Sequence, residues 1–179
     1  MTGINEKALF DDAHKDAVIS PCGLYRYSLT RIWDRWRGLM VFVMLNPSTA
    51  DADLDDPTIR RCVGFAKREG FGGVAVINLY AGRATKPADL FRMGYPNGGD
   101  QHYHWSLWLL RENRVVCGWG ANALDATEDE FYRFARSLGV TLWCLGKTKG
   151  GKPKHPLYLR GDTPLEILRF ALPPEGQLK

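Results

Sequence analysis

Residues 39–47 read LMVFVMLNP, and this stretch decides the fold. Seven consecutive apolar residues are typical of a strand that is buried on both faces, as in a parallel sheet. The Asn-Pro pair ends the strand, because proline has no backbone N–H for the ladder and turns the chain away. A strand of this kind needs parallel neighbours and helices over both faces, so we expect both in the rest of the chain.

Strand and helix patterns alternate on either side of this stretch. Three further hydrophobic runs predict strands, at residues 74–79, 114–117 and 140–145. Apolar residues at helical spacing, with Asp-Asp-Pro before the first helix, predict helices at residues 57–70, 100–112, 121–138 and 164–170. Residues 22–33 partly alternate and allow for an extra strand on an N-terminal edge.

These elements predict a three-layer α/β/α fold with a central, mostly parallel sheet of about four strands. We expect one domain over residues 21–172, because 179 residues correspond to roughly one domain. A loosely ordered N-terminal segment (1–20) and a C-terminal tail (173–179) flank it.

Composition narrows the class of protein. With 45% hydrophobic and 25% charged residues and a net charge of +4, the chain is neither disordered nor strongly basic. No apolar run approaches the ~20 residues of a membrane span, and the polar start is unlike a signal peptide. We therefore expect a cytoplasmic protein that has no membrane partner.

The cysteines and histidines give no metal or redox signature. Cys22, Cys62, Cys117 and Cys144 have no C-x-x-C spacing and are expected to be reduced, the last three as core residues. His102 and His104 are two apart, so they would not share a helix face, and no acidic or cysteine partner stands beside them. We expect no metal and no cofactor.

Polar segments follow each of the four predicted parallel strands. They are Asn46-Pro47-Ser48, Asn78 with Arg83, Gly118-Trp119, and the loop from Lys147 to His155. Ligands bind at the carboxyl ends of such strands, so we expect these segments to converge on a site. None of them carries a P-loop, a dinucleotide fingerprint or a nucleophile elbow.

The residues leave the roles at these ends open. Asn46 either orients a water or a ligand carbonyl, or only stabilises its own turn. His155 follows Lys147, Lys149, Lys152 and Lys154. That run either contacts phosphate beside a neutral imidazole, whose pKa the lysines lower, or is a solvated loop. Most aromatic residues read as core, and Tyr80, Trp119 and Tyr158 are the candidates for stacking on a base.

Three motifs carry a resemblance to known families: VMLNPSTADADLDDPTIRRC (43–62), INLYAGRATKP (77–87) and GKPKHPLYL (151–159). Over residues 22–158 they resemble the bacterial and phage family called domain of unknown function 1643, a name that implies no activity. The order of parts is also similar, more distantly, to the uracil-DNA glycosylase superfamily, especially its mismatch-specific uracil and thymine branch. That resemblance implies a uracil-DNA glycosylase-like fold.

The distant resemblance also implies roles. Asn46 would position the water that attacks the sugar C1′, in the place of a Gly-Ile-Asn-Pro motif. Asn78 would contact the base, with Arg83 and Thr85 in the place of an Arg-Thr pattern. His155-Pro156-Leu157 would stand for the His-Pro-Ser loop that enters the DNA minor groove. The chain departs from these motifs at Met44, where the motif has glycine, and at Leu157, where it has serine.

The leading hypothesis is a glycosylase-like hydrolase that breaks the N-glycosidic bond of a base in DNA or in a modified nucleotide, with Asn46 and His155 as catalytic residues. The residues expected to bind the substrate are Pro47, Ser48, Asn78, Tyr80, Arg83, Thr85, Trp119, Lys147, Lys149, Lys152, Lys154 and Tyr158. The partner would be a nucleic acid, DNA in the first place, or a nucleotide, and no obligate protein partner is evident.

Two alternatives remain. The first is a binding module that holds a nucleic acid or nucleotide without cleaving it. The second is a structural or partner-binding protein, in which Asn46, Asn78 and His155 would lie far apart.

Overall fold

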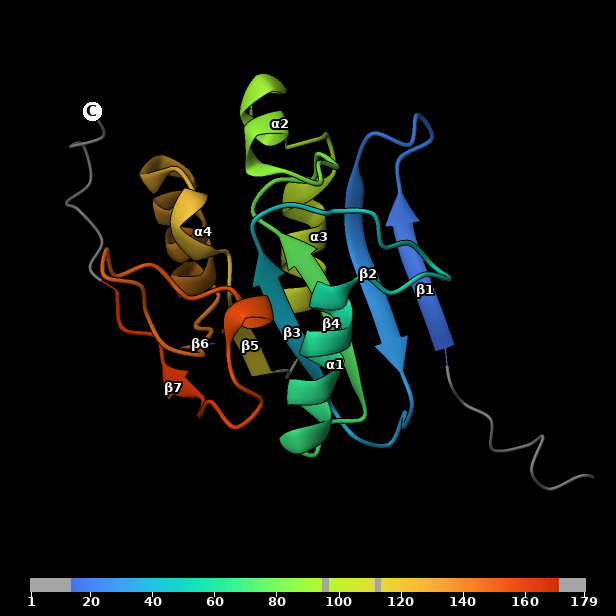
Figure 1. Ribbon diagram of the computed structural model, residues 1–179, viewed down its shortest axis with the longest axis vertical. Coiled ribbons are helices and arrows are strands. Elements are labelled where there is room, and N and C mark those ends of the chain that lie inside the picture. Colours follow the sequence, from blue (N-terminus) through green and yellow to red (C-terminus); the bar gives the residue numbers. More distant parts are fainter. Residues whose placement is uncertain (1–13, 95–96, 112–113, 171–179) are drawn as a thin grey trace, which may run out of the picture.

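The computed structural model describes residues 14–94, 97–111 and 114–170, which form a mixed α/β fold around a seven-stranded sheet (Figure 1). The strand order is β1-β2-β4-β3-β5-β6-β7. The four central strands pair in parallel: β4 (Gly73–Asn78), β3 (Leu39–Met44), β5 (Arg114–Cys117) and β6 (Leu142–Cys144). The outer strands pair antiparallel: β1 (His14–Ile19) and β2 (Arg26–Ile32) on one side, and β7 (Glu166–Ile167) on the other.

The sheet is larger than the predicted four strands. The four hydrophobic runs form its parallel centre, and the extra N-terminal strand exists as β2, but β2 is not an edge because β1 pairs with its outer side. β1 lies within the segment that we expected to be loosely ordered. Its side chains are mostly exposed, so backbone pairing rather than an apolar pattern holds it in place. Residues 1–13 and the predicted tail lie outside the described residues.

The helices largely follow the sequence prediction. They are α1 (Pro57–Arg68), α2 (Pro87–Arg92), α3 (Gln101–Leu109) and α4 (Asp125–Ser137). α1 begins as expected, because Asp56 accepts a hydrogen bond from the backbone N–H of Ile59 at 2.8 Å and Pro57 follows it. α2 lies in a segment where we predicted no helix. The predicted helix at residues 164–170 is wrong: β7 forms there and pairs with the otherwise open side of β6.

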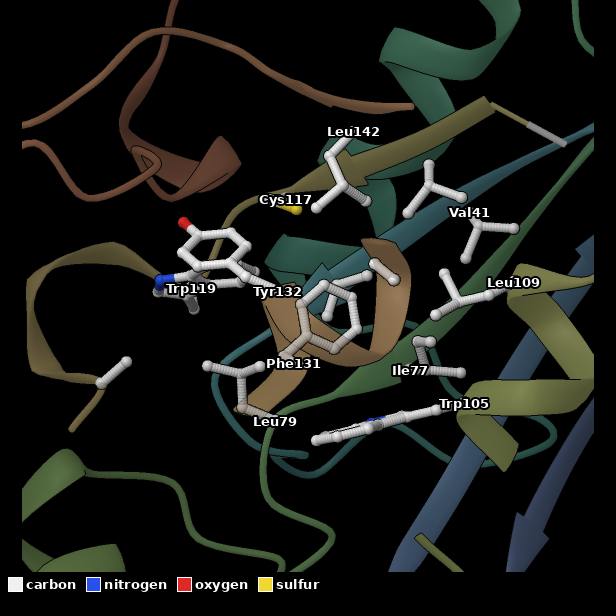
Figure 2. Packing of buried hydrophobic residues seen from close by; sticks show 14 of the residues in the cluster. Val41, Ile77, Leu79, Trp105, Leu109, Cys117, Trp119, Phe131, Tyr132 and Leu142 are labelled. Atoms are coloured by element: carbon white, nitrogen blue, oxygen red, sulfur yellow. The ribbon is translucent and has the colours of Figure 1, made fainter. Parts of the chain in front are cut away.

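The core divides into two clusters because side chains alternate along each strand. Val41 and Val43 face the side that α3 and α4 cover, whereas Met40 and Phe42 face α1. On the α3–α4 side, Phe131 packs edge-on against two tryptophans, Trp105 at 5.2 Å and Trp119 at 5.8 Å between ring centroids (Figure 2). Both faces of the sheet are thus covered, while the carboxyl ends of the parallel strands stay open to loops.

None of the helices in the described ranges has the length and apolar character to cross a membrane.

The α3–α4 cluster can be tested with a matched leucine pair. Leu79 is fully buried, and Leu110 is 65% exposed. We expect Leu79→Ala to lower the free energy of unfolding by about 2–5 kcal/mol, because it removes buried methyl groups and leaves a cavity. Leu110→Ala should change it by less than about 0.5 kcal/mol. Urea denaturation measures both, and equal losses would contradict this packing.

Candidate functional site

A pocket of about 780 Å³ opens at the carboxyl ends of the parallel strands, on the side of the sheet that α1 covers. Its walls come from β2, β3, β4, the first turn of α1 and the loops that follow β5 and β6. It brings together eight of the expected site residues: Asn46, Ser48, Asn78, Thr85, Trp119, Lys154, His155 and Tyr158. Asn46, Asn78 and His155 therefore line one pocket. The structural alternative required them to lie far apart, so the structure disfavours it.

Three other expected residues do not line this pocket. Pro47 is buried. Tyr80 is 1% exposed, and its hydroxyl accepts a hydrogen bond from the backbone N–H of Leu124 at 3.3 Å. Arg83 donates to the backbone carbonyl of Gly23 at 3.2 Å. The structure thus places these side chains where they support the fold around the pocket.

The lysine run does not act as one phosphate-contacting loop. Lys154 borders the pocket, but Lys147 donates to the backbone carbonyl of Arg169 at 2.6 Å, and the exposed Lys149 lies outside the pocket. Lys152 pairs with Asp125 at 2.8 Å and with the buried Glu128. Burial alone would lower the pKa of Lys152, but these two carboxylates outweigh it and raise the pKa.

The side chain of Asn78 is the least satisfied polar group in the pocket. Asn78 ends β4, and its backbone carbonyl accepts hydrogen bonds from Trp105 Nε1 at 2.8 Å and from Gln101 Nε2, one turn apart on α3. Its side chain is 1% exposed, yet neither Oδ1 nor Nδ2 has a partner among the described residues. An unpaired buried amide costs about 1–3 kcal/mol, so a ligand with one donor and one acceptor would relieve it.

Asn46 serves the turn and also leaves an acceptor open. Its Nδ2 donates to the backbone carbonyls of Pro47 at 2.9 Å and Ala84 at 2.8 Å. These bonds use both amide hydrogens and tie the loop after β3 to the segment after β4. Within the described ranges no donor reaches Oδ1, which leaves this oxygen to accept a hydrogen bond from a water or a ligand.

His155 is held as a neutral imidazole. It caps the short 3-10 helix Pro156–Tyr158, where its Nδ1 accepts a hydrogen bond from the backbone N–H of Leu157 at 3.3 Å. Burial lowers the pKa of His155, against the charge of Asp56, which raises it. We expected lysines to lower this pKa, and the cause is burial instead. With Nδ1 accepting, the ring proton sits on Nε2, which can donate to a ligand.

The loop that carries His155 sits directly on the end of β5. A Cβ on Gly118 would lie 2.9 Å from Cδ of Pro156 and 3.3 Å from Sδ of Met44. Only glycine allows this close approach, so the segment after β5 positions the His155-Pro156 turn over the pocket.

Of the three stacking candidates, Tyr158 alone is an exposed side chain that lines the pocket. Trp119 is 1% exposed, donates through Nε1 to Glu128, and packs in the core (Figure 2). Tyr80 is buried in the same cluster. Tyr158 is 81% exposed at the rim, with its ring centroid 5.5 Å from that of His155. A base could therefore stack on Tyr158, but not on the other two.

Sequence reasoning missed Arg26 and Asp56, which also line the pocket. We expected the acids before α1 to cap the helix, with one of them able to act as a base or to hold a cation, and Asp56 does fill the capping role. Arg26 gave no signal because the β1–β2 register shifts where Val18 pairs with Ser28 and Ile19 pairs with Arg26. The extra residue, Tyr27, breaks the alternation and turns Arg26 toward the pocket side.

Among the described residues, the pocket lining contains neither a cysteine nor a cluster of metal-ligand side chains. Burial raises the pKa of Cys62, Cys117 and Cys144. Cys22 is exposed and outside the pocket, and its hydrogen bond to Ser20 lowers its pKa. Across the part of the chain that the structure describes, no three His, Cys, Asp or Glu side chains gather as metal ligands do.

The neutral state of His155 predicts a pH effect on stability. Because burial holds the folded pKa below the ordinary 6.5, the unfolded chain binds this proton more readily, and stability is lost as the pH falls below 6.5. His155→Asn keeps a capping acceptor that does not titrate. We expect the two proteins to diverge in melting temperature below that pH, with the wild type losing more. Parallel curves would contradict the assignment.

A family model matches most of the chain. The model of the family described as a protein of unknown function, DUF1643, matches residues 26–157, a range that includes Arg26, Asn46, Asn78 and His155. No curated protein matches the chain, and no solved structure does, so these comparisons add no support for the glycosylase resemblance. Since the match covers well over half of the chain, the protein belongs to the DUF1643 family.

Proposed function

We propose that the protein binds a nucleobase in this pocket and hydrolyses the N-glycosidic bond between that base and its sugar, in DNA or in a nucleotide. The unpaired amide of Asn78 carries the proposal. Base edges present neighbouring donors and acceptors, which a carboxamide can meet with two hydrogen bonds. Met44, Ile59 and Val76 supply an apolar wall beside it, suited to the flat faces of a base. The two covered faces of the sheet also suit a three-layer, glycosylase-like fold.

The open atoms of Asn46 and His155 suit the two halves of the reaction. Hydrolysis forms a C1′–O bond from water as the C1′–N bond breaks, through an oxocarbenium-like sugar. Oδ1 of Asn46 would accept a hydrogen bond from the attacking water and hold it in place. The base departs with the bonding electron pair and takes the proton that water releases, while Nε2–H of His155 donates a hydrogen bond to it.

One observation favours binding without cleavage. Met44 stands where the resembled glycosylases have glycine, is 3% exposed, and pairs in register with Asn78. Its side chain fills space on the pocket side of β3 that a glycine would leave to the substrate. If the wild type releases the base, the function is hydrolysis. If it binds the ligand without releasing the base, the function is binding alone.

The first test replaces the amide that carries the proposal. In Asn78→Leu an apolar side chain of similar size takes the place of an unpaired buried amide. We expect the free energy of unfolding to stay unchanged or to rise by about 1 kcal/mol. Base release from duplexes and nucleotides carrying uracil, mismatched or modified bases should be lost.

The exposed Asn97 provides the matched control. Asn97→Leu should release bases at the wild-type rate. If Asn78→Leu destabilises the protein and still releases bases at that rate, Asn78 is a structural residue and the proposal is wrong.

The second test separates catalysis from binding. Asn46→Ala removes the acceptor for water, so we expect the rate of base release at saturating substrate to fall about a hundredfold or more, with little change in substrate affinity. Single-turnover kinetics and equilibrium binding on the same ligand measure the two quantities. If the wild type releases no base from any substrate yet binds the ligand, the binding module is the better description.

A further inference from the structure

Arg26 is a buried cation whose Nε has no hydrogen-bond partner among the described residues. It is 2% exposed and lines the pocket together with Asn78. Its Nη1 donates to the backbone carbonyl of Ala50 at 2.6 Å, but its Nε has no partner. Within the described residues no carboxylate forms an ion pair with it.

Its neighbour on β2 shows what a structural arginine looks like in this fold. Arg31 pairs through Nε with Asp55 at 2.7 Å, and its Nη2 donates to the backbone carbonyl of Asp51 at 2.5 Å. These bonds fix the loop before α1. Arg26 makes one such bond, to Ala50, and its buried Nε stays unpaired, so a role in holding the loop does not fully account for it.

Arg26 keeps its charge in this position. Burial lowers its pKa to about 10, which leaves the guanidinium protonated at neutral pH. A buried charge without a partner is costly, and a guanidinium presents a planar set of donors that matches the oxygens of a phosphate. A bound anion would therefore relieve the burial of Arg26.

The charges around the pocket favour an anion of small size. The charges of Asp51, Arg31 and Arg83, which lie outside the pocket lining, also act on Arg26. Among the lining residues, Arg26 and Lys154 are cations and Asp56 is a carboxylate, of which one oxygen already accepts from Ile59. The balance is one positive charge. A volume of about 780 Å³ falls in the range of pockets that enclose a whole small ligand.

The surroundings are less suited to a polynucleotide backbone. A bound strand needs a row of cations along its phosphates. The sequence suggested Lys147 and Lys152 for this purpose. Instead, Lys147 donates to the backbone carbonyl of Arg169, and Lys152 pairs with the two carboxylates of α4.

We propose that Arg26 is the anion subsite of the pocket and binds the phosphate of a free nucleotide whose base lies against Asn78. The base half of this statement rests on the proposed function. The substrate class is then a phosphorylated nucleoside, whose phosphate would bind Arg26 on β2 and whose base would bind Asn78 at the end of β4.

The test compares matched ligands on the wild-type protein. Calorimetry would measure binding of uridine, cytidine, adenosine and guanosine, their deoxy forms, and the 5′-monophosphate of each, at one salt concentration. We expect every base that binds to bind about 10- to 100-fold more tightly as the monophosphate, the usual effect of a hydrogen bond to a charged group. Arg26→Gln should reduce that preference to about twofold, and Arg26→Lys should keep part of it.

Lys149→Ala is the control, because Lys149 is exposed and lies outside the pocket. It should leave the preference unchanged. Equal affinity of nucleoside and monophosphate for the wild type overturns the proposal without any variant, so a poorly folded Arg26→Gln protein does not block the test. A preference that survives Arg26→Gln, or tighter binding of a short oligonucleotide than of the monophosphate, overturns it as well.

Base release separates this proposal from the proposed function. Nucleotides that bind through Arg26 but lose no base, together with duplexes that lose none, would support the anion subsite and contradict hydrolysis. Base release at equal efficiency from nucleosides and nucleotides would support hydrolysis and overturn the subsite. If neither ligand binds, the anion subsite is overturned, and hydrolysis then depends on base release from the DNA duplexes alone.

Discussion

The pairing of β3 with β4 is the constraint on which the rest of the structure depends. Their parallel register continues beyond the strand ends, where the backbone N–H groups of Leu79 and Tyr80 donate to the carbonyls of Met44 and Leu45 at 2.8 and 3.0 Å. The bond from Asn46 to Ala84 then extends the connection into the loops. Because both strands end together, Asn46 and Asn78 must line the same pocket.

The two faces of the sheet surround the end of β4 differently. On the α3 side, Trp105 and Gln101 both donate to the backbone carbonyl of Asn78 and hold the end of β4 in place. On the α1 side the amide of Asn78 and Nε of Arg26 are left unpaired. The support of the Asn78 backbone by α3 helps its costly unpaired side chain to persist in the pocket, as is common at functional sites.

The sequence was informative where a local pattern controls the outcome. Apolar runs predicted the four parallel strands, Asp56 and Pro57 predicted the start of α1, and the order of strand ends brought Asn46 to Asn78. It failed where long-range partners decide. Nothing near Lys152 in sequence shows that Glu128 binds it, and no local pattern shows that Tyr27 is the extra residue that redirects Arg26. β1 was missed for a related reason, because its pairing needs no apolar side chains.

The hydrogen bonds that fix the site also limit its chemistry. Both amide hydrogens of Asn46 already donate to backbone carbonyls, so its side chain can only accept a further hydrogen bond. This suits a bound water and excludes a role as a donor to an oxyanion. His155 has its Nδ1 occupied, so while neutral it can only donate. An acceptor and a donor with fixed, opposite roles border one pocket, beside an amide that can do both. This pairing of an acceptor with a donor suits a reaction in which water attacks one atom of a bond while the leaving group at the other atom takes up negative charge.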